Sequence, residues 1–391
     1  MPSPRHLSCK ALWLFFLCFC VHFLFAQSLV VSKPECIYQT GATTYKKKYY
    51  ACDAVSATLR RDDTTMYIFR STWNATFRFW GPLENAEQHP MFSLNRDLFT
   101  IPSGTTITTT WMAGASNFAN IYLKNILDLG SGELIGFLHL EYLKGLQGSA
   151  FPSCPTCPAY PAVYRIALCY SKNHGKNWTF CGDIIGANDA APGAGNIGGA
   201  AYVIVNDYIY VYFNEKVPNS EHYPSVARAL TREVIEQARH FDGQALLWHK
   251  YNARTSTWDQ DAISGIGSRI IGEKSVDMHA DAAFCIPLSK YLLAVRDNEK
   301  GGLYLYQSIN GLNWTANPVR IAADYTDKGV EHQPVFPYFA SLSADANADC
   351  SSVGKEFFIY YIGQHFSDRD KPPRQFTAED QPVFRVKVQI R

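Results

Sequence analysis

The chain has almost no net charge. Its 36 lysine and arginine residues nearly balance its 35 aspartate and glutamate residues, which leaves +1 at pH 7. Proteins that bind nucleic acid or anionic membranes usually carry an excess of positive charge, because that excess supplies much of the attraction. The balance therefore predicts neither a nucleic-acid partner nor an anionic membrane partner.

Long apolar runs are missing after the first 26 residues. Arg5 and Lys10 precede an apolar run that ends at Ala26. A basic start, a short apolar core and a small residue are typical of a secretory signal peptide, whereas a membrane helix needs roughly 20 apolar residues. We expect residues 1–26 to be removed and residues 27–391 to form one secreted, extracellular, monomeric domain. An uncleaved anchor is the alternative.

Cysteines in the expected mature chain are even in number. Three of the eleven lie in the signal peptide, and eight follow it: Cys36, Cys52, Cys154, Cys157, Cys169, Cys181, Cys285 and Cys350. An even number in an exported chain indicates disulfide bonds. We predict a bond between Cys169 and Cys181, because they flank one turn.

A second Cys-x-x-Cys pair is absent. Cys154 and Cys157 stand alone in a proline-rich segment, and a zinc site of this type needs a second pair of ligands. We therefore favour a local disulfide, or bonds to Cys36 and Cys52, over a metal.

Most of the chain repeats a short strand followed by a turn. Runs rich in β-branched and aromatic residues, bounded by Gly, Asp, Asn and Pro, are typical of β-strands. The runs cover 65–70, 134–142, 164–170, 202–214, 291–296, 302–307 and 356–362. Asn206 and Asp207 divide the fourth run into a tight hairpin. The pattern predicts an all-β protein.

One segment departs from the strand pattern. Residues 231–240 are rich in helix formers, and Val234, Ile235 and Ala238 mark one apolar face. We expect a short surface helix inserted in a loop.

Two turns share a motif. Residues 171–178 read SKNHGKNW and residues 308–314 read SINGLNW. Ser and Asn hydrogen-bond a turn backbone, Gly adopts conformations that other residues resist, and Trp packs back over the turn. Both segments resemble the aspartate box of sialidase-like and other sugar-active propellers, which joins the outer two strands of a blade. Asn173 and Asn310 replace the Asp but keep a turn-forming oxygen, so the resemblance implies a structural turn.

The spacing of the two boxes predicts the number of blades. Two blades of roughly 65 to 70 residues each fit between Ser171 and Ser308, which is a generous length for four strands and their loops. The chain then accommodates a five-bladed β-propeller. A six-bladed, sialidase-like propeller is the alternative.

Further motifs extend the resemblance from Cys52 onward. Asp53 precedes the first strand, residues 139–142 read His-Leu-Glu-Tyr, and residues 277–281 read Asp-Met-His-Ala-Asp. With the boxes, these segments resemble secreted five-bladed propellers related to arabinanases, β-xylosidases and invertases. The resemblance implies a glycoside hydrolase, or a descendant of one, that holds a carbohydrate at the mouth of the central channel. The 23 Tyr, 24 Phe and 8 Trp suit stacking on sugars.

Asp53 matches the blade-one carboxylate of these families. The resemblance implies a general base, or a nucleophile of the invertase type, and a turn-capping aspartate is the alternative. A glycoside hydrolase needs two carboxylates about 5 to 10 Å apart. We predict that Glu141 or Asp281 supplies the acid.

His139 and Glu141 alternate with leucines. Period-two geometry places these two ionisable groups on one face of the strand. Their burial needs water or mutual pairing, so a position at the channel is predicted, with a structural pair as the alternative.

Asp277, His279 and Asp281 repeat that spacing. We predict that they share one face and tune the pKa of an acid, with Asp277, His279 and His139 binding substrate. A metal held by Asp277, His279 and Asp281 is the less favoured alternative. No other cofactor is expected.

Two features weigh against catalysis. Asn196 stands where the third blade begins and where active relatives usually have Asp, and Asn does not ionise. Glu331, followed by His332, is the only group in the last blade that resembles the Glu acid of the hydrolases. We assign Asn196, Glu331 and His332 to substrate binding. The alternative function is a non-catalytic propeller that binds carbohydrate or protein.

Three Asn-x-Thr sequons occur, at Asn74, Asn177 and Asn313. In an exported eukaryotic chain such sites accept glycans. Two of them lie inside the boxes, so we expect glycans away from the channel.

Overall fold

The computed structural model describes 14 stretches of the chain, and the statements below refer to them. They are residues 28–38, 58–60, 65–72, 75–82, 99–100, 118–142, 163–186, 197–215, 222–242, 246–272, 276–327, 333–343, 351–365 and 383–391. The expected signal peptide lies outside them, as do Cys52, Asn74, Cys154, Cys157 and Cys350. No helix within these stretches has the length and apolar character needed to cross a membrane.

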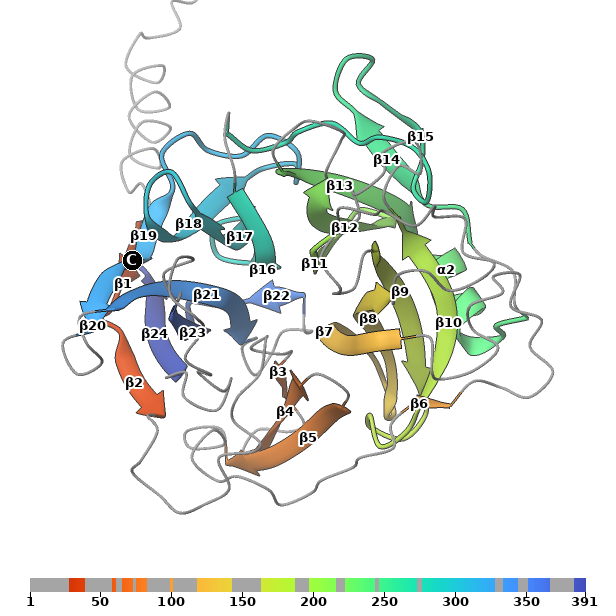
Figure 1. Cartoon of the computed structure of the whole chain (residues 1–391), viewed down its shortest axis with the longest axis horizontal. Helices are drawn as coiled ribbons and strands as arrows, with labels where there is room; N and C mark the ends of the chain where they lie inside the picture. Colours follow the sequence, from red (N-terminus) through yellow and green to blue (C-terminus); the bar gives the residue numbers. More distant parts are fainter. Residues whose placement is uncertain are drawn as a thin grey trace, which may run out of the picture.

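The described strands form five sheets arranged around a centre (Figure 1). Blade 1 contains β3 (Thr58–Arg60), β4 (Thr65–Thr72) and β5 (Ala75–Pro82). Blade 2 contains β7 (Phe118–Gly130), β8 (Glu133–Tyr142), β9 (Val163–Ser171) and β10 (Trp178–Ile185), with β6 (Phe99–Thr100) beside β10. Blade 3 contains β11 (Gly199–Val205), β12 (Tyr208–Glu215), β13 (Tyr223–Leu230), β14 (His249–Asn252) and β15 (Thr257–Asp261).

Blade 4 contains β16 (Val276–Cys285), β17 (Lys290–Asp297), β18 (Gly302–Ser308) and β19 (Val319–Ala323), with β22 (Ser352–Val353) beside β16. Blade 5 contains β20 (Tyr325–Asp327), β21 (Gln333–Ser343), β23 (Glu356–His365) and β24 (Val383–Ile390). The strands β3, β7, β11, β16 and β21 contact one another in ring order, and β21 returns to β3. These five inner strands confirm the five-bladed propeller over the six-bladed alternative.

The two ends of the described chain close the ring. The N-terminal strands β1 (Leu29–Val31) and β2 (Glu35–Tyr38) both pair with β24 in blade 5, as the orange and blue arrows in Figure 1 show. Ser28 and Arg391 exchange two backbone hydrogen bonds of 2.8 and 3.0 Å. Arg385 adds an ion pair of 2.8 Å to Glu35. Blade 5 is therefore built from both ends of the sequence, which removes one exposed sheet edge.

The local predictions hold. Six of the seven predicted runs each lie in one strand, and the run 202–214 is the predicted hairpin of two strands, which turns at Asn206, whose φ of 54° lies in the left-handed region. The predicted helix is α2 (Thr231–Arg239), which follows β13 and buries Val234 and Ala238 against the core of blades 2 and 3. The side-chain pattern alone was sufficient here because each element buries the face that its period marks.

The two box turns have the same internal hydrogen bonds. The backbone N–H of Gly175 donates to Ser171 Oγ at 2.9 Å, and that of Asn177 donates to Asn173 Oδ1 at 2.9 Å. In blade 4, Gly311 donates to Ser308 Oγ and Asn313 to Asn310 Oδ1, both at 2.9 Å. Asn173 and Asn310 thus accept the turn hydrogen bonds that the aspartate of the box would accept, which confirms the predicted structural turn.

Each box turn packs against the preceding blade. The Trp178 ring lies edge-on to Phe69 of blade 1 at 6.1 Å, and the Trp314 ring lies edge-on to Tyr212 of blade 3 at 5.5 Å. Gly175 and Gly311 have φ values of 71° and 73°, and a Cβ at either would lie within 2.9 Å of the facing aromatic ring or hydroxyl. The glycines are needed for both the turn and the close approach.

The predicted disulfide between Cys169 and Cys181 is wrong. Both residues are buried free thiols. Antiparallel pairing sets Cys169 opposite Phe180, so Cys181 points to the other face of the sheet. The Cys169 thiol contacts the Gly136 carbonyl and the Cys181 thiol contacts the Ala238 carbonyl, at 3.6 and 3.7 Å. Burial raises the pKa of Cys181 to about 12.

The contact between blades 3 and 4 can be weakened one group at a time. The buried Tyr212 hydroxyl donates to the Gly311 carbonyl at 2.9 Å. We expect Tyr212→Phe to lower the free energy of unfolding by about 1 kcal/mol through the lost hydrogen bond, and Tyr212→Ala by about 3–5 kcal/mol through the cavity. Urea denaturation measures both. Tyr208→Phe on the same strand is the control and should change little; equal losses for the two Phe variants would contradict the assignment.

Candidate functional site

Strand direction brings the starts of the inner strands to one end of the ring. In each blade from 2 to 5 the inner strand begins where the second strand ends: Tyr122 pairs with His139, Asp277 with Arg296 and Val335 with His365. Polar residues at these strand ends therefore gather around the same opening, the channel mouth. This location is the one predicted for His139 and Glu141.

A cluster of histidine and tyrosine rings spans the channel mouth. His139 of β8 contacts the rings of Tyr122 and Tyr164 from its own blade, with centroids 5.8 and 5.3 Å apart. Across the centre it meets His279 of blade 4 edge-on at 6.0 Å. His279 in turn contacts Tyr338 of blade 5 at 5.2 Å. Three blades thus contribute to one ring cluster.

Blade 3 completes the surroundings of His279. A Cβ on Gly198 would lie 3.2 Å from His279 Cε1 and 3.3 Å from Asn214 Nδ2, so both side chains reach the Gly198 backbone. Asn214 is buried, and its backbone N–H donates to the Gly198 carbonyl at 2.8 Å. The amide of Asn214 and the imidazole of His279 therefore share one small space between blades 3 and 4.

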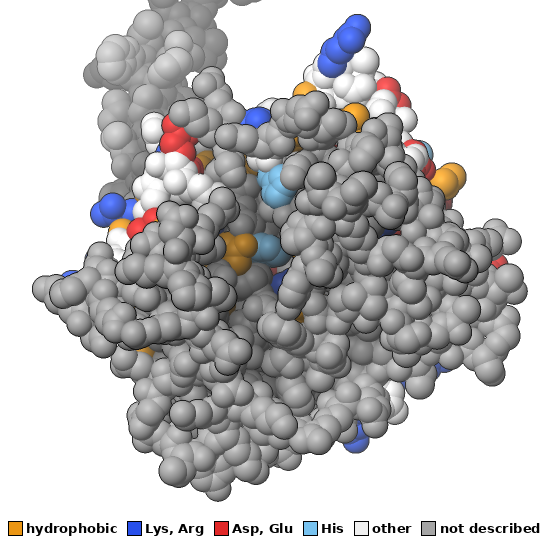
Figure 2. All heavy atoms as spheres, viewed as in Figure 1, with side chains coloured by type: hydrophobic (Ala, Val, Ile, Leu, Met, Phe, Trp, Pro, Cys, Tyr) orange, Lys and Arg blue, Asp and Glu red, His pale blue; other side chains and the backbone are white. Residues whose placement is uncertain are grey.

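The ring centre is hollow in the space-filling view. Figure 2 shows pale-blue histidine atoms and an orange hydrophobic side chain inside a depression near the middle of the ring. Imidazoles donate and accept hydrogen bonds, and tyrosines present an apolar face with a polar tip. A surface of this composition can hold a polar ligand that also has apolar faces.

Asp281 is buried and hydrogen-bonds to residues of neighbouring blades. Its carboxylate accepts the backbone N–H of Ala282 at 2.8 Å and that of Leu342, in blade 5, at 2.7 Å. Asn125 of blade 2 hydrogen-bonds the same carboxyl group and also donates to the Ala200 carbonyl of blade 3 at 3.1 Å. The inner strands of four blades meet at this group.

Burial dominates the acid–base chemistry of Asp281. The carboxyl is buried, and desolvation raises its pKa to about 7 although the hydrogen bonds from Leu342, Ala282 and Asn125 favour the charged form. A carboxyl with this pKa exchanges a proton near neutral pH. Its role as general acid stays a prediction. In the structure, Asp281 connects blade 4 to blades 2 and 5 through hydrogen bonds.

Strand β16 contains a β-bulge between Asp277 and Asp281. Asp277 pairs with Arg296 and Asp281 with Ala294, so four steps on β16 face two steps on β17. Beside the bulge, the His279 ring contacts the rings of His139 and Tyr338. The Asp281 carboxylate accepts the backbone N–H of Leu342. Bulges commonly redirect side chains beside functional sites.

The backbone of β8 pairs regularly with β9 on both sides of His139. The register with β9 runs without a shift from Leu134 to Tyr142, so the strand predicted for this segment is regular, and the shared face of His139 and Glu141 stays a prediction. The side chains of Glu141 and Asp277 lie outside the described residues, although their backbones belong to β8 and β16. Asp53, Asn196, Glu331 and His332 also lie outside them. Their site roles stay predictions.

Among the described side chains, no three His, Cys, Asp or Glu residues are grouped to hold a metal ion. The alternative site at Asp277, His279 and Asp281 includes a side chain outside that set.

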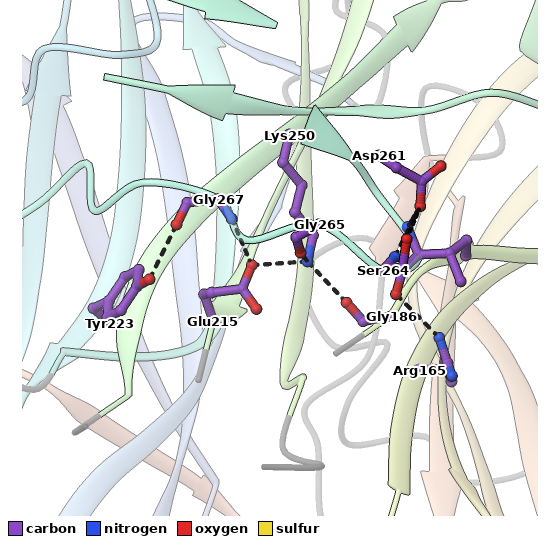
Figure 3. A network of polar contacts seen from close by, with 10 residues as sticks. Arg165, Gly186, Glu215, Tyr223, Lys250, Asp261, Ser264, Gly265 and Gly267 are labelled. Atoms are coloured by element: carbon purple, nitrogen blue, oxygen red, sulfur yellow. Dashed lines mark hydrogen bonds and ion pairs between the residues drawn. The ribbon is translucent and has the colours of Figure 1, made fainter. Parts of the chain in front are cut away.

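A buried ion pair supports the channel mouth from blade 3. Lys250 and Glu215 are fully buried and lie 2.7 Å apart. Figure 3 shows Lys250 Nζ pointing at Glu215 and at the carbonyls of Gly186 and Gly265, both 2.8 Å away. These three acceptors match the three N–H groups of the ammonium. Burial lowers the pKa of Lys250, and the Glu215 carboxylate opposes that change.

The ion pair fixes the strand end that carries Asn214. Glu215 follows Asn214 on β12, and its carboxylate also accepts the Gly267 N–H at 2.9 Å. Gly186 follows the last strand of blade 2, so Lys250 ties two blades together. Because every N–H of Lys250 is occupied, we assign it a positioning role.

The sequence patterns did not identify the site residues that lie on strands far apart in the chain. Tyr122, Tyr164, Asn214 and Tyr338 lie in strands whose patterns mark them only as strand residues. Lys250 alone carried a signal, since a lysine in a short aromatic strand is unusual. Only the fold brings these side chains to one place.

The chain matches no family model and no curated protein. Solved structures do match. An α-L-arabinofuranosidase from Lactobacillus brevis has a TM-score of 0.50 at 10% identity, over 90% of this chain and 94% of that chain. The α-L-arabinofuranosidase from Podospora anserina in complex with cellotriose has a TM-score of 0.47 at 9% identity, over 91% and 95%.

A family 117 glycoside hydrolase from the marine bacterium Zobellia galactanivorans has a TM-score of 0.46 at 10% identity, over 93% of this chain and 90% of that chain. The match with the Lactobacillus brevis enzyme agrees with the ring of five sheets. The chain therefore shares its five-bladed propeller fold with glycoside hydrolases, and at this identity the likeness concerns the fold.

The buried Asp281 predicts a pH dependence of stability. Its folded pKa of about 7 lies above the ordinary value of 3.8, so between these pH values the folded chain keeps a proton that the unfolded chain releases. The free energy of unfolding from this group therefore falls as pH rises from 4 to 7, by at most about 1.4 kcal/mol per pH unit. Asp281→Asn should abolish that contribution.

Urea unfolding at pH 5 and pH 8 measures the effect. We expect Asp281→Asn to be less stable than the wild type at pH 5, because it loses one acceptor for a backbone N–H, and the gap should narrow at pH 8. Asp207→Asn, in the exposed hairpin turn, is the control. A gap that is constant across this range would disprove the titration of Asp281.

The Lys250–Glu215 pair predicts strong coupling. Lys250→Met leaves a buried, uncompensated carboxylate and should lower the free energy of unfolding by about 3–5 kcal/mol. The double variant with Glu215→Gln should lose less than the sum of the single variants. Lys300→Met is the matched control, because Lys300 is 42% exposed in its pair with Asp297 and should lose at most about 1 kcal/mol. Equal losses for the two Lys variants would refute the coupling.

Proposed function

We propose that the protein is a carbohydrate-active propeller that acts on a glycan at the channel mouth, as a glycoside hydrolase. The observation that carries the proposal is the ring cluster of His139, His279 and Tyr338, which joins blades 2, 4 and 5. A sugar presents hydroxyl groups around its edge and C–H groups on its faces. Imidazoles and an amide suit the first, and tyrosine rings suit the second.

The proposed roles follow the chemistry of each group. His139, His279 and Asn214 position hydroxyl groups, and Tyr338 packs against a sugar face. Asp53 serves as base or nucleophile, with Glu141 or Asp281 as the acid, because cleavage of a glycosidic bond needs a proton donor and a second carboxylate. A pKa of about 7 for Asp281 suits a group that holds its proton at neutral pH.

Asn196 favours a second candidate function. An amide at the start of the third blade neither ionises nor tunes a neighbouring acid as a carboxylate does. If the machinery for cleavage is incomplete, the same cluster serves a non-catalytic propeller that binds carbohydrate. The two functions differ in turnover and agree in binding.

Glycan hydrolysis and glycan binding, measured on the same preparations, test the proposal. We expect the wild-type protein to release sugar from at least one plant or algal polysaccharide, and Asp53→Asn to lose release by about 10³-fold or more while still binding. Tyr338→Ala should weaken binding about tenfold, which corresponds to about 1.4 kcal/mol. Tyr208→Phe, far from the mouth, serves as the control.

The outcomes separate the candidates. Binding without release from any polysaccharide would support the binding propeller and reject the hydrolase. Neither binding nor release, or binding that is unaffected in Tyr338→Ala, would reject carbohydrate recognition at the channel mouth.

A further inference from the structure

We propose that the protein is exported and carries N-linked oligosaccharides on Asn177 and Asn313, in the two box turns and at the end of the propeller opposite the channel mouth. Both residues belong to Asn-Trp-Thr sequons. Both side chains are exposed. The inference is independent of what the mouth binds.

Each box turn contains two asparagines with different roles. One stabilises the turn, and the other is the proposed site of glycan attachment. Asn173 Oδ1 accepts the N–H of Asn177, and Asn310 Oδ1 accepts the N–H of Asn313, both at 2.9 Å. Asn177 and Asn313, the proposed sites of glycan attachment, contribute only their backbone N–H groups to these bonds. Within the described residues, the side-chain amides of Asn177 and Asn313 make no hydrogen bond. A substituent on either amide therefore leaves the turn intact.

The tryptophan between acceptor and threonine anchors each sequon. Trp178 is fully buried against Phe69, and Trp314 packs on Tyr212. Trp178 begins β10, where side chains alternate between the two faces, so its buried ring directs the flanking side chains away from the core. Trp178 is fully buried and Trp314 is partly buried, and the asparagine before each tryptophan is exposed.

The turns lie far from the channel mouth. Tyr164, the second residue of β9, contacts His139, and the strand ends at Ser171, seven residues later, which at about 3.3 Å per residue corresponds to roughly 23 Å. In blade 4, β18 begins opposite Asp297 at the mouth and ends at Ser308, where the second turn starts. Glycans on both turns leave the mouth open to a ligand.

The modification is a group transfer with a defined donor. The Nδ2 of the asparagine attacks C1 of an oligosaccharide carried on a lipid diphosphate. The C1–N bond forms as the C1–O bond to the diphosphate breaks, the amide loses one proton to a base of the transferring enzyme, and the lipid diphosphate leaves. The threonine hydroxyl two residues on is the feature that the enzyme requires.

Mass spectrometry of the full chain, expressed with its own N-terminus in a glycosylating eukaryotic cell, tests the proposal. The parent protein for all variants carries Asn74→Gln, so that only the sequons at Asn177 and Asn313 can receive an oligosaccharide. We expect peptide N-glycosidase to lower the mass by two oligosaccharides and to convert Asn177 and Asn313 to Asp. The variants Asn177→Gln and Asn313→Gln should each lose one oligosaccharide and keep the parent's urea midpoint after deglycosylation.

The matched controls change the structural asparagines. Asn173→Gln and Asn310→Gln keep the sequons, so both oligosaccharides should persist, while the free energy of unfolding falls because an acceptor of a turn N–H is displaced. Unmodified Asn177 and Asn313 in protein from the medium and from the cells would overturn the proposal.

Discussion

Asp281 occupies the point at which the inner strands of four blades meet. Its buried carboxyl accepts backbone N–H groups from blades 4 and 5, and Asn125 connects it to blades 2 and 3. A buried carboxyl without such partners would be strongly destabilising, so the hydrogen bonds and the positions of the strands depend on each other. Three members of the channel-mouth cluster lie on these inner strands: Tyr122 on β7, Tyr338 on β21, and His279 on β16, two residues before Asp281. The geometry of the site is therefore a consequence of how the blades are held at the centre.

Around this centre, the blades are joined by apolar packing that repeats with the fold. In blades 2 and 4 a box turn presses a tryptophan and a glycine against an aromatic residue of the blade before it. The repeated sequence motif and the repeated contact are one feature, because the glycine of each turn allows the backbone to approach an aromatic residue of the preceding blade closely. The pairing of β1 and β2 with β24 completes the ring. Each blade can bury both faces only when the ring is closed.

Much of the fold and part of the site could be predicted from local pattern. The strands, the hairpin at Asn206, the helix at 231–239 and the boxes depend on neighbours within a few residues, and each was confirmed. The regular strand around His139 was also predictable from its period of two. The Cys169–Cys181 bond was wrong because flanking a turn does not fix which face a residue occupies; the register with Phe180 decides that. The shared face expected for Asp277, His279 and Asp281 stays a prediction, and the bulge between Asp277 and Asp281 could not be foreseen, because a bulge depends on the partner strand.

The sequence by itself determined the class of the protein: an all-β chain with a near-neutral surface, two box turns and polar residues at strand ends. Those properties depend on composition and on short-range periodicity. Only the tertiary structure decided that His139 meets His279, that Tyr338 joins them, and that Lys250 saturates its hydrogen bonds on Glu215, Gly186 and Gly265. These partners lie far apart in the chain. Their contact depends on the closing of five blades into a ring, which no local pattern encodes.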